Sequence, residues 1–328
     1  MLSDARNQFG AVVIGRNEGE RLKRCLFSVS SAAFVIYVDS DSTDESVTWA
    51  KDHGFSVVEL DTRIMFTAAR ARNVGFGHLR KAVPDIEFVQ FIDGDCEMNQ
   101  DWPLQAISFL STHPDTCAVF GRRRERYPDR SIYNRLCDSE WNVPVGKALA
   151  FGGDIMMRTA ALERVGGYRD DFIAGEEPEL CVRLRAAGWQ IWRLDCEMTL
   201  HDAAMTRFSQ WWLRTVRSGY AFAQGAALHG ALPERHWVWE SRRALLWGIL
   251  LPLTCVMAVI VFGAWGSTAW LVYPLQMLRR MARREGPLRI RAEASFFELL
   301  ARFPESLGQL KFIRDRLLGR PGLLIEYK

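Results

Sequence analysis

The chain has 328 residues, 48% of them hydrophobic, so it can bury a sizeable core and is not expected to be disordered. Its formal net charge of +3 is small for this length and gives no support to a general nucleic-acid binder, which would show a concentrated basic stripe. Seven cysteines without a C-x-x-C pair argue against zinc clusters and a disulfide framework, and favour a reducing, cytoplasmic setting. Residues 1–7 lack an apolar run, so no cleavable secretory signal is expected.

Apolar runs and amphipathic stretches alternate through residues 1–243. Strands are predicted at Gly10–Ile14, Phe34–Val38, Ser56–Leu60 and Phe88–Ile92. Helices are predicted at Glu18–Ser30, from Ser42–Ser46 to about His53, and at Thr67–Arg80. This alternation implies an α/β fold with a mainly parallel sheet and flanking helices. Ligands of such sheets bind at the carboxyl ends of the strands, where the polar residues Arg16–Glu18, Asp39 and Asp93–Asp95 fall.

Asp93 and Asp95 flank Gly94 directly after the fourth predicted strand. Glycine lets the backbone turn tightly and lets a bulky anion come close. Hard oxygen ligands of this kind suit Mg²⁺ or Mn²⁺ while leaving places for waters and substrate phosphates. The sequence therefore predicts a metal site that offsets the charge on a departing diphosphate. An ordinary polar turn is the alternative, because Asp-Gly is a common turn pair.

A strong helix is predicted to begin at Glu176 and Glu177, with Leu180 and Leu184 on one face and Gly188 at its end. Acids near a helix N-terminus and a proline in the first turn are ordinary start signals, so a purely structural role is one interpretation. The other is that one of these carboxylates is a general base that deprotonates an acceptor hydroxyl.

His201 follows the predicted strand Gln190–Leu194 and a short connection. A lone histidine is usually structural, although neutral imidazole also suits a Mn²⁺ site beside carboxylates. Asp39 either belongs to a capped helix start or accepts hydrogen bonds from a nucleobase or ribose. Arg72 lies on a predicted helix, and from the residues alone it is expected on a solvated face.

Taken together in chain order, the motifs described above resemble those of the family 2 glycosyltransferases with the A-type fold. The similarity covers roughly residues 10–220, and the ordered set is specific although each motif is weak alone. The residues that carry it are Val12–Glu18, Tyr37–Asp44, Ala71–Gly75, Phe91–Asp95, Gly152–Asp154, Val165–Tyr168 and Gly175–Leu184.

The resemblance implies a nucleoside diphosphate sugar as donor. It makes Asp93 and Asp95 the carboxylates that bind the metal and the donor phosphates, with His201 as a further metal ligand. Glu18, Asp39 and Arg72 match donor-nucleotide positions, and Arg16 is grouped with them at the strand end.

Gly152, Gly153 and Asp154 match the region that faces the sugar and the acceptor. Glu177 stands where the family usually has an aspartate base. Its side chain is longer than that of aspartate and reaches differently, so Glu176 is kept as a second candidate for the base. Ser40 stands where many relatives have a second aspartate, which puts a uracil contact there in doubt. Relatives of this kind invert the anomeric configuration by direct displacement. Gln210–Arg214 lacks the Q-x-x-R-W spacing of processive synthases, which favours addition of a single sugar.

Residues Ala244–Leu278 include no Asp, Glu, Lys, Arg or His, and are enough for one full membrane span. Arginines flank this stretch at positions 242, 243, 279, 280, 283 and 284. Basic clusters prefer the cytoplasmic side, so a hairpin that turns near Gly263–Ser267 would keep both clusters beside the catalytic domain. A re-entrant hairpin and a buried hairpin of a soluble dimer are the alternatives.

We therefore expect a catalytic domain at 1–235 and a membrane-associated region at 236–328, made of a hydrophobic hairpin at 244–278 and an amphipathic tail at 290–328. Within this tail, Ala294–Leu318 is expected to lie on the membrane surface or against the catalytic domain. The predicted location is the cytoplasmic face of the inner membrane, with a lipid-linked or membrane-held acceptor.

Two other functions are compatible with parts of the pattern. A nucleotidyltransferase also pairs a nucleotide-binding sheet with metal carboxylates, but it would carry a glycine-rich basic loop for which Gly15–Glu18 is a poor substitute. A non-catalytic membrane scaffold with a degenerate transferase domain is disfavoured by the intact Asp93, Asp95 and Glu177.

Overall fold

The computed structural model describes residues 8–320 and 322, so the N-terminal residues 1–7 and the end of the predicted tail at 323–328 lie outside the described residues. The chain divides into two compact units, Met1–Ala204 and Met205–Lys328. The functional boundary at residue 235 stays a prediction, and helix α9 (Phe208–His229) belongs to the second unit.

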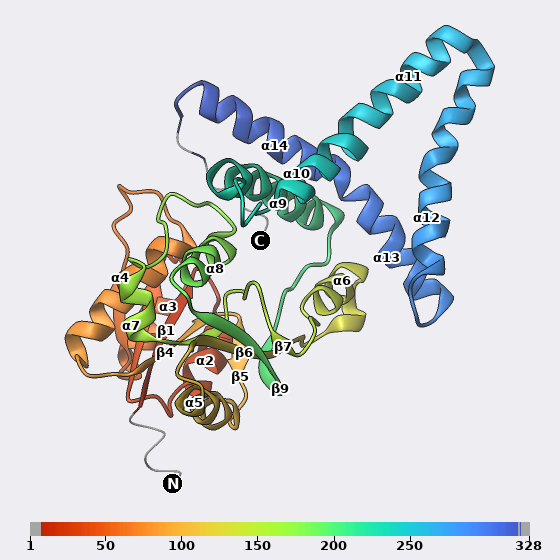
Figure 1. The fold of residues 1–328 in the computed structure, drawn as a ribbon. Coiled ribbons are helices and arrows are strands. Elements are labelled where there is room, and N and C mark those ends of the chain that lie inside the picture. Colours follow the sequence, from red (N-terminus) through yellow and green to blue (C-terminus); the bar gives the residue numbers. More distant parts are fainter. Residues whose placement is uncertain (1–7, 321, 323–328) are drawn as a thin grey trace. The chain divides into compact units, whose positions relative to one another are not determined.

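A nine-stranded sheet with flanking helices forms the first unit (Figure 1). The strand order is β3-β2-β1-β4-β8-β6-β9-β5, and β7 pairs with β9. Its strands are β1 (Phe9–Gly15), β2 (Phe34–Asp39), β3 (Ser56–Glu59), β4 (Phe88–Asp93), β5 (Cys96–Met98), β6 (Thr116–Glu125), β7 (Gly146–Lys147), β8 (Ile155–Arg158) and β9 (Gln190–His201). Its helices are α2 (Glu20–Ser28), α3 (Ser46–Asp52), α4 (Ala68–Ala82), α5 (Trp102–Thr112), α6 (Ile132–Glu140), α7 (Thr159–Arg164) and α8 (Glu176–Ala186).

The predicted α/β class and the first four strands are confirmed, but the sheet is more mixed than predicted. Strand β1 pairs in parallel with β2 and β4, and β2 pairs in parallel with β3. Strand β8, by contrast, is antiparallel to both β4 and β6. The chain leaves β6 at the edge where β4 ends and enters β8 from that same edge, so no crossover helix restores the parallel direction.

Strand β9 corrects a second expectation, because Gln190–His201 is one continuous strand and not a short strand followed by a connection. It pairs in parallel with β6 and antiparallel with β5, which places His201 opposite both Glu125 and Cys96. Its pairing with β6 has a register shift between the partners of Arg193 and Glu197 and then continues to His201.

The strand directions bring many polar positions to one edge of the sheet. Asp93 ends β4 beside Ile14 of β1, and Asp39 ends β2 beside Gly15. Glu125 and His201 end β6 and β9, which run in the same direction. Asp154 directly precedes β8, and Asp95 directly precedes β5, so both enter the sheet from this edge.

The second unit is helical, with a hairpin at its centre (Figure 1). It contains α9, α10 (Val238–Leu245), α11 (Leu251–Phe262), α12 (Val272–Ala282), α13 (Leu288–Leu300) and α14 (Arg302–Leu317), with a π-helical turn at Leu246–Leu250 and a 3₁₀ segment at Gly263–Leu271. Figure 1 shows the chain reversing between α11 and α12, as predicted. The helical run Val238–Ala282 is long and apolar enough to cross a membrane, with a mean hydropathy of 2.6 in its most apolar window.

Two helices, α13 and α14, replace the single amphipathic stretch expected at Ala294–Leu318. Helix α14 packs on α9, where a Cβ added at Gly219 would strike the backbone of Glu305 and one added at Gly308 would strike that of Val216. The outward face of α14 exposes four large apolar side chains: Leu307, Leu310, Ile313 and Leu317.

The contact between α4 and the sheet generates a stability prediction. A Cβ added at Gly75 would strike Val12 of β1 and come within 2.8 Å of Val38 Cγ2 of β2. Gly75→Ala is therefore expected to lower the free energy of unfolding by about 1–3 kcal/mol. Gly77 has no atom within 4 Å of the added Cβ, so Gly77→Ala on the same helix should raise stability by up to about 1 kcal/mol. Urea unfolding of both variants tests this, and equal effects would contradict it.

Candidate active site

Arg72 of α4 lies at the centre of the polar cluster at the sheet edge. Its Nη2 donates to Asp93 Oδ1 at 3.0 Å, and its Nη1 donates to Glu176 Oε1 at 2.9 Å. The same Nη1 lies 3.2 Å from Glu177 Oε1. The Arg72 side chain is only 2% exposed, and its guanidinium lies over the ring of Tyr168. Arg72 is thus not on a solvated face, since it joins the end of β4 to the start of α8.

Asp93 is held by a second guanidinium, that of Arg123 on β6. Arg123 Nη2 lies 3.4 Å from Asp93 Oδ2, and Arg123 Nε lies 3.6 Å from Asp154 Oδ2. Burial raises the pKa of the Asp93 carboxyl, but Arg72 and Arg123 outweigh it and hold the pKa below its usual value. Asp93 is therefore ionised in the range where a transferase works.

Asp95 and His201 form the other half of the cluster. His201 Nε2 lies 3.3 Å from Asp95 Oδ2, and His201 Nδ1 lies 3.4 Å from Glu125 Oε2. Glu125 is itself fixed, because it accepts hydrogen bonds from Asn134 Nδ2 and from the backbone N–H groups of Tyr127 and Ala203. A carboxylate on one ring nitrogen orients the imidazole and leaves the other nitrogen directed at Asp95.

The predicted sugar and acceptor residues adjoin Asp93. Asp154 accepts a hydrogen bond from the Asp93 backbone N–H at 3.1 Å and one from Thr199 Oγ1 at 2.7 Å. A Cβ at Gly153 would lie 2.6 Å from Asp93 Oδ2 and 2.8 Å from Arg72 Nη2, so only glycine fits against this ion pair. Gly152 precedes it in the segment that leads into β8, with no atom within 4 Å of an added Cβ.

Besides Arg72, three of the predicted nucleotide residues lie where β1 and β2 end: Asp39 is the last residue of β2, and Arg16 and Glu18 follow β1. Both oxygens of the buried Asp39 accept hydrogen bonds, from Tyr37 Oη at 2.6 Å and from the Ser42 backbone at 2.8 Å. Arg16 donates to the Asp41 carbonyl and lies over the ring of Phe66, and Glu18 pairs with Arg21. These contacts fix the shape of the loops after β1 and β2, and their role in binding a nucleotide stays a prediction.

Glu176 and Glu177 differ in environment although both begin α8. Glu176 is 4% exposed and hydrogen-bonds Arg72, whereas the Glu177 side chain is 15% exposed. Burial and, after it, the charge of Glu176 raise the pKa of the Glu177 carboxyl to about 7, although Arg72 opposes both. A carboxyl that is partly exposed and titrates near neutral pH suits proton transfer better than one fixed in an ion pair.

The cluster contains two sets of groups that could hold a metal ion. The ligand atoms of Asp95, Cys96 and His201 lie within 4.8 Å of one another, as do those of Asp93, Cys96 and Asp154. Burial raises the pKa of the Cys96 thiol well above its usual value, so the thiol stays protonated. Carboxylate oxygens and an imidazole nitrogen then remain, and this donor set fits Mg²⁺ or Mn²⁺.

Arg123, Glu125 and Thr199 belong to the site but were not predicted. Each comes from a strand interior or strand end, and each pairs with a residue more than 25 positions away in sequence. The charged run Arg122–Glu125 at the end of a buried strand was the one local signal that could have revealed them.

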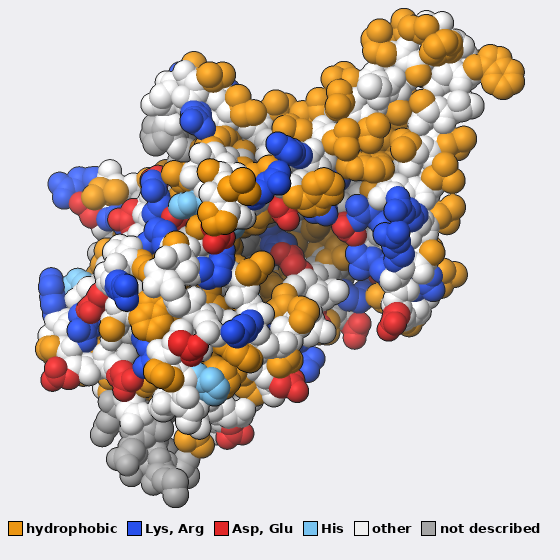
Figure 2. Space-filling model, viewed as in Figure 1, with side chains coloured by type: hydrophobic (Ala, Val, Ile, Leu, Met, Phe, Trp, Pro, Cys, Tyr) orange, Lys and Arg blue, Asp and Glu red, His pale blue; other side chains and the backbone are white. Residues whose placement is uncertain are grey.

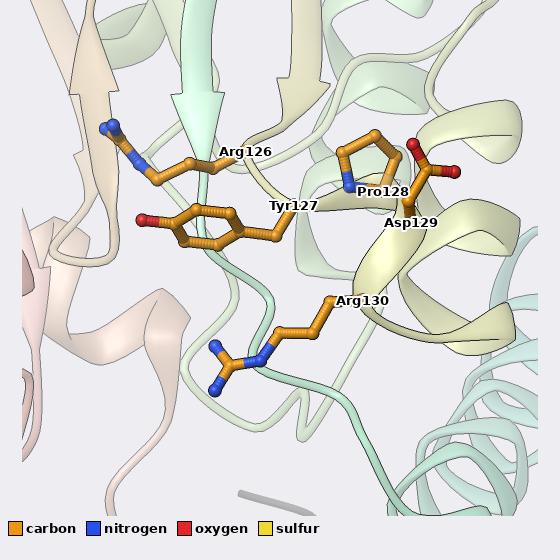
Figure 3. A pocket seen from close by; sticks show the side chains of 5 residues that line it. All are labelled: Arg126, Tyr127, Pro128, Asp129 and Arg130. Carbon is orange, nitrogen blue, oxygen red and sulfur yellow. The ribbon is translucent and has the colours of Figure 1, made fainter.

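The five residues that follow Glu125 in the sequence line an open pocket (Figure 3). Its lining residues are Arg126, Tyr127, Pro128, Asp129 and Arg130. Figure 3 shows Arg126, Tyr127 and Arg130 directed away from Pro128 and Asp129. The Arg126 backbone N–H donates to the His201 carbonyl, so the pocket adjoins the strand that carries the histidine.

Comparison with known proteins identifies the class of this fold. The family described as Glycosyl transferase family 2 matches residues 11–160. A mannosyltransferase, PcManGT from Pyrobaculum calidifontis, solved with GDP-Man and Mn²⁺, superposes with a TM-score of 0.63 and 19% identity, covering 94% of this chain and 88% of its own. The TarS fragment 1–349 of S. aureus superposes with a TM-score of 0.51 and 15% identity, covering 95% of this chain and 92% of its own.

Two curated relatives match parts of the sequence. The succinoglycan biosynthesis protein ExoA of Rhizobium meliloti (strain 1021) is 30% identical over 145 residues, which are 44% of this chain and 43% of ExoA. The glycosyltransferase AglE of Haloferax volcanii is 25% identical over 190 residues, which are 53% of this chain and 60% of AglE. The chain thus spans about half the length of the curated relatives it matches.

Sequence and fold agree on the class, since the first unit has the A-type glycosyltransferase fold. Residues 11–160 match the family 2 glycosyltransferases, and both curated relatives are similar to this chain over about half of its length.

The contact between Glu125 and His201 generates a prediction about metal binding. Glu125→Gln places an amide group against the His201 ring and the Ala203 N–H, so the imidazole loses its orienting acceptor. We expect Mn²⁺ affinity, measured by calorimetry with a nucleoside diphosphate present, to fall about 10–100-fold. Glu197→Gln is the matched control, because Glu197 lies on the same strand as His201 but is exposed and pairs with Arg124. The same affinity in both variants would remove Glu125 from this role.

Proposed function

We propose that this protein is an inverting, metal-dependent glycosyltransferase. It moves a sugar from a nucleoside diphosphate sugar to a hydroxyl of a lipid-linked or membrane-held acceptor, in polysaccharide or glycolipid assembly. The observation that carries the proposal is that Arg72 joins Asp93, on the donor-phosphate side, to Glu176 and Glu177, on the acceptor side.

The charge balance of the site supports a divalent cation. Two guanidinium groups, those of Arg72 and Arg123, pair with the described carboxylates Asp93, Asp154, Glu176 and Glu177, while Asp95 and Glu125 face His201. A donor diphosphate adds further negative charge, so it cannot bind here without additional positive charge. Asp95 and His201 would hold the ion, which supplies positive charge next to the departing diphosphate.

The chemistry assigned to the chain's own residues is a single displacement. Glu177 removes the proton from the acceptor hydroxyl, and the hydroxyl oxygen forms a bond to the anomeric carbon of the donor sugar. The bond between that carbon and the diphosphate oxygen breaks, and the diphosphate leaves with the electron pair. Attack from the face opposite the leaving group inverts the anomeric configuration. Arg72 keeps Glu177 and Asp93 at a fixed separation throughout.

Similar proteins support the substrate class. PcManGT was solved with GDP-Man and Mn²⁺, which is consistent with a nucleoside diphosphate sugar and a divalent ion. The name of ExoA refers to succinoglycan, which is consistent with polysaccharide assembly.

The second unit supports an acceptor held at the membrane. Only 6% of the most apolar window in Val238–Ala282 is buried within the protein. Such a surface is costly in water, and its arginine flanks favour the cytoplasmic face of the inner membrane.

Separate replacement of Glu176 and Glu177 distinguishes the general base from the glutamate that only pairs with Arg72. Glu177→Gln is expected to lower kcat about 10²–10⁴-fold and to flatten its pH profile. In the native enzyme kcat should rise through about pH 7 to a plateau, because only ionised Glu177 accepts a proton. Glu176→Gln removes a charge that raises the Glu177 pKa, so the rise should persist but move to lower pH. A flat profile for Glu176→Gln with a normal one for Glu177→Gln would reverse the assignment.

Metal-dependent donor binding is tested by thermal shift with a panel of nucleoside diphosphates, with and without Mn²⁺. One base is expected to raise Tm in the presence of Mn²⁺, because a ligand that binds the folded state stabilises it. Asp95→Asn should abolish the Mn²⁺-dependent part of this shift and the turnover. Asp101→Asn is the control, since Asp101 is an exposed residue six positions further along. Turnover that is unchanged in Asp95→Asn would remove Asp95 from the mechanism.

A further inference from the structure

Four arginines gather at the base of the hairpin in the second unit, in excess over the carboxylates around them. Arg280 and Arg284, at the end of α12, both pair with Glu298 of α13. Arg302 of α14 pairs with Glu305 at 2.6 Å and also donates to the Glu298 carbonyl. Arg243 of α10 is the fourth, because α10 packs on α14, where Ser241 and Gln309 exchange hydrogen bonds, and because its charge acts on both Arg302 and Glu305.

Arg243 is the member without a partner. Its side chain is half-buried, its Nε is inaccessible to water, and among the described residues it forms no hydrogen bond or ion pair. Arg302 is only 5% exposed, and burial lowers the pKa of its guanidinium below the usual value. Two carboxylates therefore face four guanidinium groups in a partly buried place, which is a costly arrangement unless an anion completes it.

The apolar surface above this cluster indicates where the anion comes from. Tyr273 Oη donates to the Trp247 carbonyl at 2.7 Å, and this contact marks the base of the hairpin. From Trp247 to Phe262 the first arm rises about 24 Å, which is less than the hydrocarbon core of about 30 Å. This arm is long enough to enter a bilayer, and the reversal between α11 and α12 returns the chain to the face from which it entered (Figure 1).

The space-filling view shows that the hairpin has an apolar part and a basic part. Figure 2 shows apolar side chains over the tip and arms of the hairpin, and basic side chains gathered at the lower end of α12. Trp265 at the tip is 83% exposed. With the apolar arms in the bilayer core, the arginines at the base lie at the depth of the phosphate groups.

We propose that Arg243, Arg280, Arg284 and Arg302 form a binding site for the phosphate of an anionic membrane lipid, and that the hairpin is re-entrant. Arg243 and the partly exposed Arg284 contact the phosphate, while Arg280 and Arg302 shape the site through Glu298 and Glu305. The site explains the unpaired guanidinium. It goes beyond the proposed function, because it concerns binding of a lipid that is not itself glycosylated.

The test is flotation of the full-length protein with vesicles of phosphatidylcholine, with or without phosphatidylglycerol. The native protein is expected to bind more tightly when phosphatidylglycerol is present. Arg243→Gln should lower the affinity for the anionic vesicles by more than about tenfold, because a charge-assisted contact is lost. Arg242→Gln is the matched control: Arg242 is the exposed neighbour on the same helix, and loss of a general surface attraction should cost at most roughly fivefold.

Equal losses in Arg243→Gln and Arg242→Gln, or binding indifferent to phosphatidylglycerol, would overturn the site. Arg284→Gln is the second variant if Arg243→Gln does not fold, since Glu298 keeps Arg280 as its partner. A soluble ligand is distinguished by inorganic phosphate in the presence of EDTA. A rise in Tm with phosphate that Arg243→Gln abolishes would assign the site to free phosphate and overturn the lipid. Vesicle binding needs no donor, so an inactive Asp95→Asn protein that still binds vesicles separates this inference from the proposed function.

Discussion

Negative charge concentrated at one edge of a sheet is the constraint on which the first unit depends. Several strands, the loops between them and the start of α8 contribute these largely buried carboxylates, which are Asp93, Asp95, Glu125, Asp154, Glu176 and Glu177. Burying carboxylates is costly unless each finds a cation or a hydrogen-bond donor. Several groups share this compensation. Arg72 and Arg123 offset the negative charge of the carboxylates near Asp93, and His201 lies between Asp95 and Glu125.

The position of Arg72 follows from packing elsewhere in the unit. Gly75 brings α4 close to β1 and β2, and Thr67 caps the helix by accepting a hydrogen bond from the Arg70 N–H. Asn73, next in sequence, exchanges hydrogen bonds with the backbone of Tyr168, whose ring lies under the Arg72 guanidinium. Helix packing, a cap and a loop contact thus combine to place one side chain, and through it the distance between Asp93 and the two glutamates of α8.

Sequence patterns predicted those features whose signal is local. The parallel half of the sheet was predictable, because each apolar run ends in polar residues at the ligand-binding edge. The hairpin was predictable, because Ala244–Leu278 lacks charge. Strand β9 was missed beyond Leu194, although exposed Asp195 and Glu197 alternate with buried or half-buried neighbours in the pattern of a strand with one solvated face. The charged run at the end of β6 was the one local signal for Arg123 and Glu125, but it does not reveal their roles, because each depends on partners that only the folded chain brings near. The network around Arg72 spans 104 positions, and for the same reason its burial could not be predicted.

Gly153 affects how quickly the ion pair between Asp93 and Arg72 can become exposed to solvent. The ion pair between Asp93 and Arg72 is covered by the backbone of residue 153 and not by a side chain. Side chains change rotamer in picoseconds to nanoseconds, whereas a backbone segment moves in nanoseconds to microseconds or more slowly. The segment before β8 is also anchored, because Asp154 binds both the Asp93 N–H and Thr199. The pair of Asp93 and Arg72 is therefore shielded by a slowly moving backbone segment, and it persists while the more exposed side chains around it change rotamer.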